Sequence, residues 1–334
     1  MSGVADAVSN LTIRPYAGEV DIPELVRIMN AESEADGIAE RETVAGMRAW
    51  LSNPSAQFDP ARDVVVAELD GRPVGMASQD WVDTREGEMR EFRLWGAVHP
   101  EYRRRGIGTA LLADNERRAR ALWSSAPTDL RPVFGSWSAD GRPAAKLLEG
   151  AGYELVRWFF DMLRRTLDEA PPDVPLPEGL DLRRVTREQY PAIWKANREA
   201  FRDHWGGSDE SEAAMKRFLE APDADPSLWL IAWEGSEIAG GVINSIHAEE
   251  NEALGLQRGW LDSVFTRRQW RRRGLARALI GKSLLLLRDR GMTSAGLGVD
   301  ADNPSGALGL YEDAGFEIEE RFNAWRKPME ARET

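Results

Sequence analysis

The sequence predicts an α/β (α+β) fold made of two tandem domains, each with a mixed central β-sheet flanked by helices. The chain has 334 residues, which is more than one typical domain needs and enough for two. Similar segments recur at a spacing of about half its length. In each half, short strand patterns alternate with amphipathic helical patterns, as expected for helices packed on a sheet.

The clearest repeated segment is basic and glycine-rich: YRRRGIG at 102–108 is matched by WRRRGLA at 270–276. The pairs 11–15 with 180–184 and 147–153 with 310–316 keep nearly the same spacing. A repeat of this length indicates a duplicated domain, because solenoid repeats are far shorter. Residues 169–179 are rich in proline and acidic residues, which predicts a stiff linker between a first domain at 1–168 and a second at 180–334.

Each half predicts the same order of elements. Apolar residues at spacings of three and four predict helices, and apolar runs bounded by turns such as Asp70-Gly71 and Glu234-Gly235 predict strands. The first half is expected to contain strands at 11–14, 63–68, 73–78, 93–98 and 133–136, with helices at 22–30, 106–122 and 144–150. The second half is expected to contain strands at 180–183, 228–233, 237–244, 260–266 and 294–299, with helices at 190–201, 274–290 and 305–314 and a last strand after them.

Composition excludes several classes of function. The net charge of −13 argues against binding to nucleic acid or an anionic membrane. The chain has no cysteine, so disulfides and cysteine-bound zinc are excluded, and its three histidines lack the spacing of a metal pair. Without a signal-peptide pattern or a long apolar run, the sequence predicts a cytoplasmic protein with no metal.

The repeated basic segment predicts a phosphate-binding turn. It follows a strand and opens a helix, where free backbone N–H groups and the helix dipole favour anions. Glycine permits close approach of the backbone, and arginine suits phosphate oxygens. A solvated surface cluster is the plainer interpretation of one such segment, but recurrence in the same context favours phosphate. A dinucleotide fingerprint fits worse because Leu111 stands where its third glycine belongs. A P-loop also fits worse because Ala276 stands where its first glycine belongs.

Together with residues 302–316 (DNPSGALGLYEDAGF), these segments resemble the GCN5-related N-acetyltransferase (GNAT) family over nearly the whole chain. The resemblance implies acetyl-CoA as acyl donor, bound in a V-shaped opening that a bulge in the central strand creates. In the second half it implies the cofactor-binding residues Val264, Phe265, Thr266, Arg271, Arg272, Arg273, Gly274, Leu275, Ala276 and Asn303. In the first half it implies Ala97, Val98, Arg103, Arg104, Arg105, Gly106, Ile107 and Gly108.

Acyl transfer to an amine needs a base for the amine and an acid for the leaving thiolate. Asp262, on the strand before the second loop, is the candidate base, and a structural salt bridge is an equally good interpretation. Tyr311 matches the family's acid, although an aromatic residue there also suits the core. Asn303 is expected to contact the cofactor or to cap the following helix.

The first half departs from this pattern. The positions that match the presumed acid, amide and base hold Leu148, Asp140 and Leu94. This half is therefore expected to bind acyl-CoA without turnover or to serve as a structural partner. Glu91 lies nearby in the sequence and could take the role of the missing base in this half.

The predicted function is acetyl transfer from acetyl-CoA to a small-molecule amine or a peptide N-terminus, by a monomer or homodimer. The tandem arrangement with the better-equipped site in the second half also resembles the mycothiol synthase family. The alternative is a non-catalytic acyl-CoA sensor that regulates a partner. His247 falls in an edge-strand or loop segment and receives no role.

Overall fold

The computed structural model describes residues 10–84, 89–125, 128–169, 174–303 and 306–330. These residues form two compact units that do not follow the order of the sequence. Unit 1 takes its described residues from Met1–Val156, Gly206–Pro222 and Asn323–Thr334, and unit 2 consists of Arg157–Trp205 and Asp223–Phe322. The predicted second domain includes residues 206–222 and 323–330, which belong to unit 1 in the structure, and the predicted first domain includes residues 157–168, which belong to unit 2.

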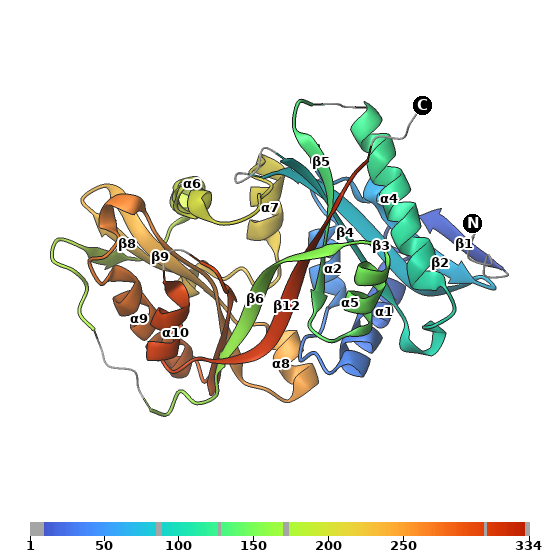
Figure 1. The fold of residues 1–334 in the computed structure, drawn as a ribbon. Coiled ribbons are helices and arrows are strands. Elements are labelled where there is room, and N and C mark those ends of the chain that lie inside the picture. Colours follow the sequence, from blue (N-terminus) through green and yellow to red (C-terminus); the bar gives the residue numbers. More distant parts are fainter. Residues whose placement is uncertain (1–9, 85–88, 126–127, 170–173, 304–305, 331–334) are drawn as a thin grey trace. The chain divides into compact units, whose positions relative to one another are not determined.

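Unit 1 contains one mixed sheet with the strand order β1-β2-β3-β4-β5 followed by the end of β12 (Figure 1). Neighbouring strands from β1 to β4 are antiparallel, and β4 and β5 are parallel. The strands are β1 (Leu11–Pro15), β2 (Val64–Leu69), β3 (Arg72–Asp83), β4 (Met89–Val98), β5 (Arg131–Ala139) and β12 (Glu317–Pro328). The helices are α1 (Ile22–Asp36), α2 (Val44–Trp50), α3 (Pro60–Asp63), α4 (Ile107–Ser125), α5 (Pro143–Gly150) and α7 (Glu212–Glu220).

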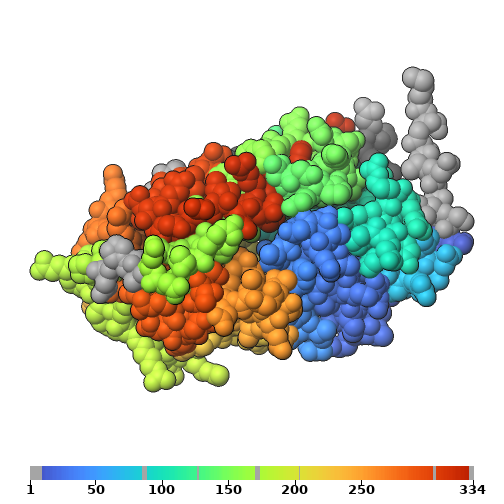
Figure 2. Space-filling model, turned by 90° about the horizontal axis from the view of Figure 1, so that it is seen from below, coloured from blue at the N-terminus to red at the C-terminus, as the bar shows by residue number. Residues whose placement is uncertain are grey.

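The side chains of β2 alternate between the two faces of this sheet. Val64 and Val66 pack in one core with residues of α1 and α2, while Val65 and Ala67 pack in another with residues of α4. Successive side chains of a strand point to opposite faces, so a run of β-branched residues covers both. Figure 1 shows α4 lying across this sheet, and Figure 2 shows the blue-to-teal surface of the described residues between 10 and 125 gathered together.

Unit 2 repeats the plan with the strand order β6-β11-β10-β9-β8-β7. β10 and β11 are parallel, as their counterparts β4 and β5 are in unit 1. The strands are β6 (Glu154–Arg164), β7 (Asp181–Arg183), β8 (Leu230–Glu234), β9 (Glu237–Ser245), β10 (Arg258–Thr266) and β11 (Ser294–Asp300). The helices are α6 (Tyr190–Ala200), α8 (Ala248–Leu254), α9 (Leu275–Asp289) and α10 (Ala307–Asp313).

The last strand, β12, begins in unit 2 and ends in unit 1. In unit 1 its end is held by buried groups: Trp325 packs with Phe92 and Phe134, and its indole N–H donates to Ser138 Oγ at 2.9 Å. Met329 N donates to the Pro132 carbonyl oxygen at 3.2 Å. Packing and hydrogen bonds thus make the chain's C-terminal segment part of the core that the chain's first half builds.

The expected strands and helices are present, with ends that shift by a few residues, and each unit has the mixed sheet flanked by helices that the sequence predicts. The short helices α2, α3, α7 and α8 were not individually predicted. His247 lies in the short loop between the end of β9 and α8, in agreement with the predicted edge strand or loop, while residues 248–250 of the same segment begin α8. Helices of seven residues or so carry too little periodicity to stand out from a polar loop.

Candidate active site

The basic loop has the same backbone conformation in both halves. Each loop passes through a short 3-10 helix, Pro100–Tyr102 or Arg268–Trp270, before α4 or α9 begins. Arg104 and Arg272 adopt left-handed φ values of 62° and 59°. Gly106 and Gly274 follow with φ values of 82° and 84°, which a glycine adopts without strain. Such alternation at a helix N-terminus makes a concave set of N–H groups that suits a phosphate.

Next to each loop, two parallel strands separate. The registered pairing of β4 with β5 ends at Arg93 and Gly135, and that of β10 with β11 ends at Trp260 and Gly296. Both strands that lead into the loops continue beyond that point, β4 to Val98 and β10 to Thr266. The V-shaped opening that the family resemblance implied is therefore present in each unit.

In unit 1 this opening forms a cleft of about 520 Å³. Its walls are the free end of β4, the facing part of β5, the basic loop and the helices α4 and α5. Of the residues predicted to bind the cofactor in this half, Val98, Arg103, Arg104, Gly106 and Gly108 line the cleft. An apolar slot that ends at a glycine-rich helix N-terminus suits a long acyl-CoA molecule with a phosphate-bearing end.

Some residues predicted for cofactor binding in the first half lie elsewhere. Ala97 is buried in the core with α1, and Ile107 is buried in the core beneath α4. Arg105 stacks its guanidinium over the Tyr102 ring at 5.3 Å and donates to the Glu101 carbonyl oxygen. Their backbone groups remain candidates for cofactor contact, while their side chains serve the fold of the loop.

The first arginine of each loop bonds to neighbouring protein. Arg103 donates to Asp36 at 2.6 Å and Glu32 at 3.2 Å, both on α1. Arg271 donates to the backbone oxygens of Thr266 at 3.1 Å and Ala200 at 2.9 Å. In both units this arginine ties the loop to the helix that precedes the sheet hairpin, and its contact with phosphate stays a prediction.

Glu32 is a charged group at the cleft that sequence reasoning missed. Burial raises its pKa from the usual value near 4.5 to about 7, although the positive charge of Arg103 acts against that change. Glu32 and Asp36 are four residues apart on one face of α1, and that spacing is the signal by which a shared partner could have been found.

In unit 2, Asp262 occupies an irregular position of β10. The register between β9 and β10 shifts between Leu261 and Ser263, so Asp262 is the extra residue of a β-bulge. Its side chain reaches solvent, yet surrounding protein desolvates it and raises its pKa, with Asp223 adding to the rise. A hydrogen bond from Ser245 and the charge of His247 oppose the rise without cancelling it.

Ser245 and His247 form a second feature that the sequence did not reveal. Ser245 Oγ lies 2.9 Å from His247 Nε2, and His247 Nδ1 lies 3.5 Å from Asp223 Oδ2. The side chains of His247 and Asp223 are 38% and 37% exposed, so this chain of polar groups leads from Asp262 to solvent. Its members come from the end of β9, the bulge of β10 and the loop before β8, and only the fold brings them together.

Tyr311 lies on α10, packed edge-on against Phe316, and is buried in the core of unit 2. Burial raises its pKa to about 12, so the phenol keeps its proton at neutral pH. The residue before the first turn of this helix is Gly306, and its N–H donates to the Asn303 carbonyl oxygen at 3.2 Å. The expected contact of Asn303 with the cofactor stays a prediction.

In unit 1, the positions that match Asp262 and Tyr311 are apolar, and the position that matches Asn303 is acidic. Leu94 and Leu148 line its cleft, and Asp140 accepts a hydrogen bond from Asn323 at 3.1 Å. Glu91, considered as a rescued base, is buried against Arg326, whose Nη2 lies 2.5 Å from its carboxylate. It does not line the cleft, because an ion pair with the end of β12 holds it elsewhere.

Within the described ranges, no helix is long and apolar enough to cross a membrane. The same residues contain no group of three or more histidine, aspartate or glutamate side chains placed to hold a metal ion.

A strand, a basic glycine-rich loop and a helix beside two splayed parallel strands, present twice, are the arrangement expected of a tandem acyl-CoA-dependent transferase. Comparison with known proteins agrees. The acetyltransferase (GNAT) family model matches residues 190–316, and an acetyltransferase (GNAT) domain model matches residues 60–155. The chain is 32% identical to a mycothiol acetyltransferase of Salinispora arenicola, over 89% of this chain and 90% of that protein. It is 28% identical to a mycothiol acetyltransferase of Geodermatophilus obscurus, over 95% of this chain and 99% of that protein.

Solved structures show the same architecture. A GCN5-related N-acetyltransferase from Sphaerobacter thermophilus superposes with a TM-score of 0.71 at 27% identity and 97% coverage of both chains. A tandem GNAT protein from the clavulanic acid biosynthesis pathway superposes with the same TM-score over 97% of this chain and all of that chain. The sequence identity is 18%, so this likeness shows the shared fold. The chain therefore belongs to the GNAT acetyltransferase family, as a tandem member. It transfers an acetyl group from acetyl-CoA to an amine.

Proposed function

We propose that acetyl transfer takes place in the second half of the chain, with Asp262 as base and Tyr311 as acid, and that the acceptor is a small-molecule amine. The observation that carries this assignment is the contrast between two copies of one fold. The bulge position and the α10 position hold Asp262 and Tyr311 in unit 2, whereas unit 1 holds leucine at both. Such a substitution removes the groups that move protons and preserves those that shape a cleft.

The surroundings of Asp262 suit a base. A carboxylate whose pKa is raised by desolvation accepts a proton more readily near neutral pH. Ser245 hydrogen-bonds to it, and His247 follows at 2.9 Å from that hydroxyl. We assign these two residues the task of passing the proton from the acceptor ammonium on to solvent, since His247 is half-exposed.

Tyr311 supplies the complementary step. Because burial keeps its phenol protonated, it retains a proton to donate as the thiolate of the donor leaves. Backbone N–H groups of β10 from Val264 to Thr266, where β11 no longer pairs, are the groups we assign to the thioester carbonyl oxygen. Acetyl-CoA supplies the activated acyl group, and the loop around Gly274 is assigned to its phosphates.

The nature of the acceptor rests on the relatives. Those named mycothiol acetyltransferase, at 28–32% identity over about nine-tenths of this chain or more, favour a small molecule over a peptide. We propose mycothiol lacking its acetyl group as the first acceptor to test. A peptide N-terminus serves as the contrasting acceptor.

The test compares Tyr311→Phe with the matched variant Tyr16→Phe, which removes a hydroxyl from unit 1. With acetyl-CoA and desacetylated mycothiol, product formation followed by mass spectrometry should fall roughly 100-fold or more in Tyr311→Phe and stay unchanged in Tyr16→Phe. Equal rates in the two variants would remove Tyr311 from the mechanism. A calorimetric count of acetyl-CoA sites then tests the cleft of unit 1: two sites per chain are expected, and Gly106→Glu should abolish one.

A further inference from the structure

Asp223 lies at the solvent end of the polar contacts that begin at Asp262 in unit 2. His247 Nδ1 is 3.5 Å from Asp223 Oδ2, while His247 Nε2 is 2.9 Å from Ser245 Oγ. The Ser245 hydroxyl in turn hydrogen-bonds to Asp262. The two ring nitrogens of one histidine therefore face a carboxylate and a hydroxyl. A carboxylate beside one ring nitrogen favours a proton there and leaves the other nitrogen to accept a hydrogen bond.

The loop before β8 holds Asp223 in place. Its carbonyl oxygen accepts from the Asp225 N–H at 2.9 Å, and the Asp225 carboxylate accepts from the Ser227 N–H at 2.8 Å. Asp225 is thereby the N-cap residue of the 3-10 helix Pro226–Leu228, which leads into β8. A residue on a capped turn keeps its direction, so the Asp223 carboxylate stays beside the imidazole.

His247 is fixed by its backbone and by an aromatic ring beside it. It is the N-cap residue of α8, and its carbonyl oxygen accepts from the Asn251 N–H at 2.9 Å. Its imidazole lies edge-on to the Trp260 ring, with the centroids 6.3 Å apart and the planes at 62°. A side chain held at both places has few orientations, so the contacts of Nδ1 and Nε2 are set by the fold.

Trp260 is itself held firmly on the sheet. Its ring covers Gly296 of β11, where a Cβ would lie 2.6 Å from a ring carbon. It also contacts Arg258, whose guanidinium carbon is 4.5 Å from the ring centroid. Arg258 pairs with Glu250 at 3.0 Å, and both of these side chains are 8% exposed. Packing and charge thus give His247 a rigid wall.

Asp262 needs a route by which to lose the proton that it takes. Its side chain is exposed, and an acceptor amine that gives it a proton covers that exposed side. The carboxylate also meets Ser245, which is 6% exposed, and then His247, whose side chain is 38% exposed. The route through these two residues therefore reaches solvent without passing the acceptor.

We propose that Asp223 is a positioning residue for acetyl transfer, which keeps the proton of neutral His247 on Nδ1 so that Nε2 accepts from Ser245. This role rests on the proposed function, in which Asp262 takes a proton from the acceptor ammonium. The Asp262 carboxyl gives that proton to Ser245 Oγ as the hydroxyl proton of Ser245 passes to His247 Nε2. The Asp223 carboxylate stabilises the imidazolium that forms, which then releases one proton to water. One proton leaves the ammonium and one enters solvent.

The first measurement needs no substrate. The chain has three histidines, so nitrogen NMR of histidine-labelled protein separates their ring nitrogens, and His247→Leu identifies the signals of this residue. Where the imidazole is neutral, the native chain should show a protonated Nδ1 and an unprotonated Nε2. Asp223→Asn should move much of that proton to Nε2, because an amide attracts a proton on Nδ1 far less than a carboxylate does. Asp223→Glu restores the carboxylate and should restore the tautomer.

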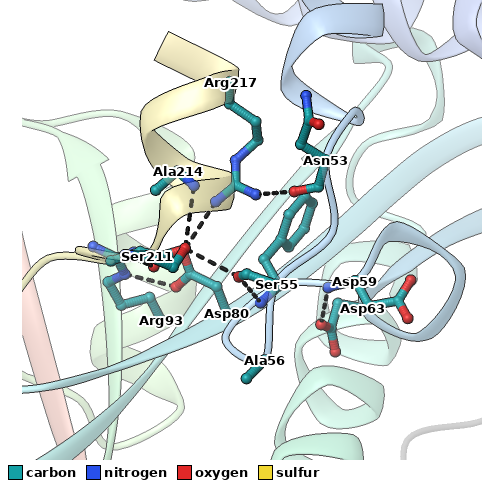
Figure 3. A network of polar contacts seen from close by, with 12 residues as sticks. Asn53, Ser55, Ala56, Asp59, Asp63, Asp80, Arg93, Ser211, Ala214 and Arg217 are labelled. Carbon is teal, nitrogen blue, oxygen red and sulfur yellow. Dashed lines mark hydrogen bonds and ion pairs between the residues drawn. The ribbon is translucent and has the colours of Figure 1, made fainter. Parts of the chain in front are cut away.

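The second measurement follows acetyl transfer to desacetylated mycothiol at low buffer concentration. Asp223→Asn should lower kcat roughly tenfold, and added imidazole should recover most of the rate, because an external base then takes the proton. Asp59→Asn is the matched control in unit 1 (Figure 3). The Asp59 carboxylate accepts from the Ala61 N–H at 3.1 Å at the start of α3, and asparagine keeps that bond. This variant should match the native chain in both measurements.

A proton on Nε2 in the native chain would overturn the proposal, and so would an unchanged tautomer or an unchanged rate in Asp223→Asn. A loss of rate that neither imidazole nor Asp223→Glu relieves would show a merely structural role and overturn it too. The proposed function fails in another way, through acetyl transfer that survives in Asp262→Asn and Tyr311→Phe. If the native chain forms no product, the proposed acceptor is refuted and the NMR comparison alone decides the role of Asp223.

Discussion

Replacing Arg326 by methionine should destabilise unit 1, although this residue lies near the end of the chain. Its guanidinium contacts the Glu91 carboxylate at 2.5 and 2.7 Å, and the two side chains are only 12% and 5% exposed. Glu91 also fills the space above Gly135, where a Cβ would lie 2.3 Å from its carboxylate oxygen. The methionine thus removes the guanidinium that lies against this buried carboxylate, and removing one member of a buried ion pair costs about 3–5 kcal/mol of unfolding free energy.

The double variant Glu91→Met/Arg326→Met separates charge from packing. Replacing a buried pair by apolar side chains is commonly close to neutral, so the double variant should recover most of the loss. Arg117→Met is the control, because its pair with Asp114 lies at the surface of the same unit with Arg117 68% exposed, and it should cost at most about 1 kcal/mol.

Urea unfolding combined with hydrogen exchange of the β4 and β5 amides measures this change in unit 1 alone. If Arg326→Met costs no more than Arg117→Met, the buried ion pair does not hold β12 in unit 1 and the reasoning fails.

Three other perturbations follow from the titrating groups. Glu32→Gln should flatten the pH dependence of stability. The pKa of Glu32 is about 7 in the folded chain and near 4.5 in the unfolded chain, so the free energy of unfolding of the native chain falls by up to about 3 kcal/mol as the pH rises from 4.5 to above 7. Urea unfolding midpoints measured at several pH values test this. Asp262→Asn should abolish the acidic limb of the pH profile of kcat/KM. In the native chain this limb lies above the usual pH range of an aspartate, because the pKa of Asp262 is raised. If the limb survives in Asp262→Asn, another residue is the base. His247→Leu should move that limb to higher pH, because the imidazolium lowers the pKa of Asp262, and a shift to lower pH would contradict the assignment.

Local patterns allowed much of the fold to be predicted. The loops around Gly106 and Gly274 are recognisable because their glycines and arginines sit in sequence where the backbone needs left-handed residues. The helices α4 and α9 follow from long apolar periodicities. The tandem family assignment followed from the repetition of these local features.

Features that depend on distant partners were not predictable. Glu91 and Arg326 are 235 residues apart, and nothing in either neighbourhood specifies the other. The contacts of Ser245 and His247 with Asp223 and Asp262 likewise arise where three separate segments meet. A sequence pattern identifies a carboxylate on a strand, while its surroundings, and hence its pKa, come from tertiary structure. The roles of Asp262 and Tyr311 remain predictions.

The path of β12 has a consequence for how the protein is made. Unit 1 draws most of its residues from the part of the chain before unit 2, yet it needs Asn323, Trp325 and Arg326, which are translated only after all of unit 2. Domains encoded first usually complete their folding first. Here the domain that is begun earlier is completed only after unit 2 has been translated, so a premature stop just before Asn323 would damage unit 1, and cutting the gene at the predicted linker would leave two incomplete halves.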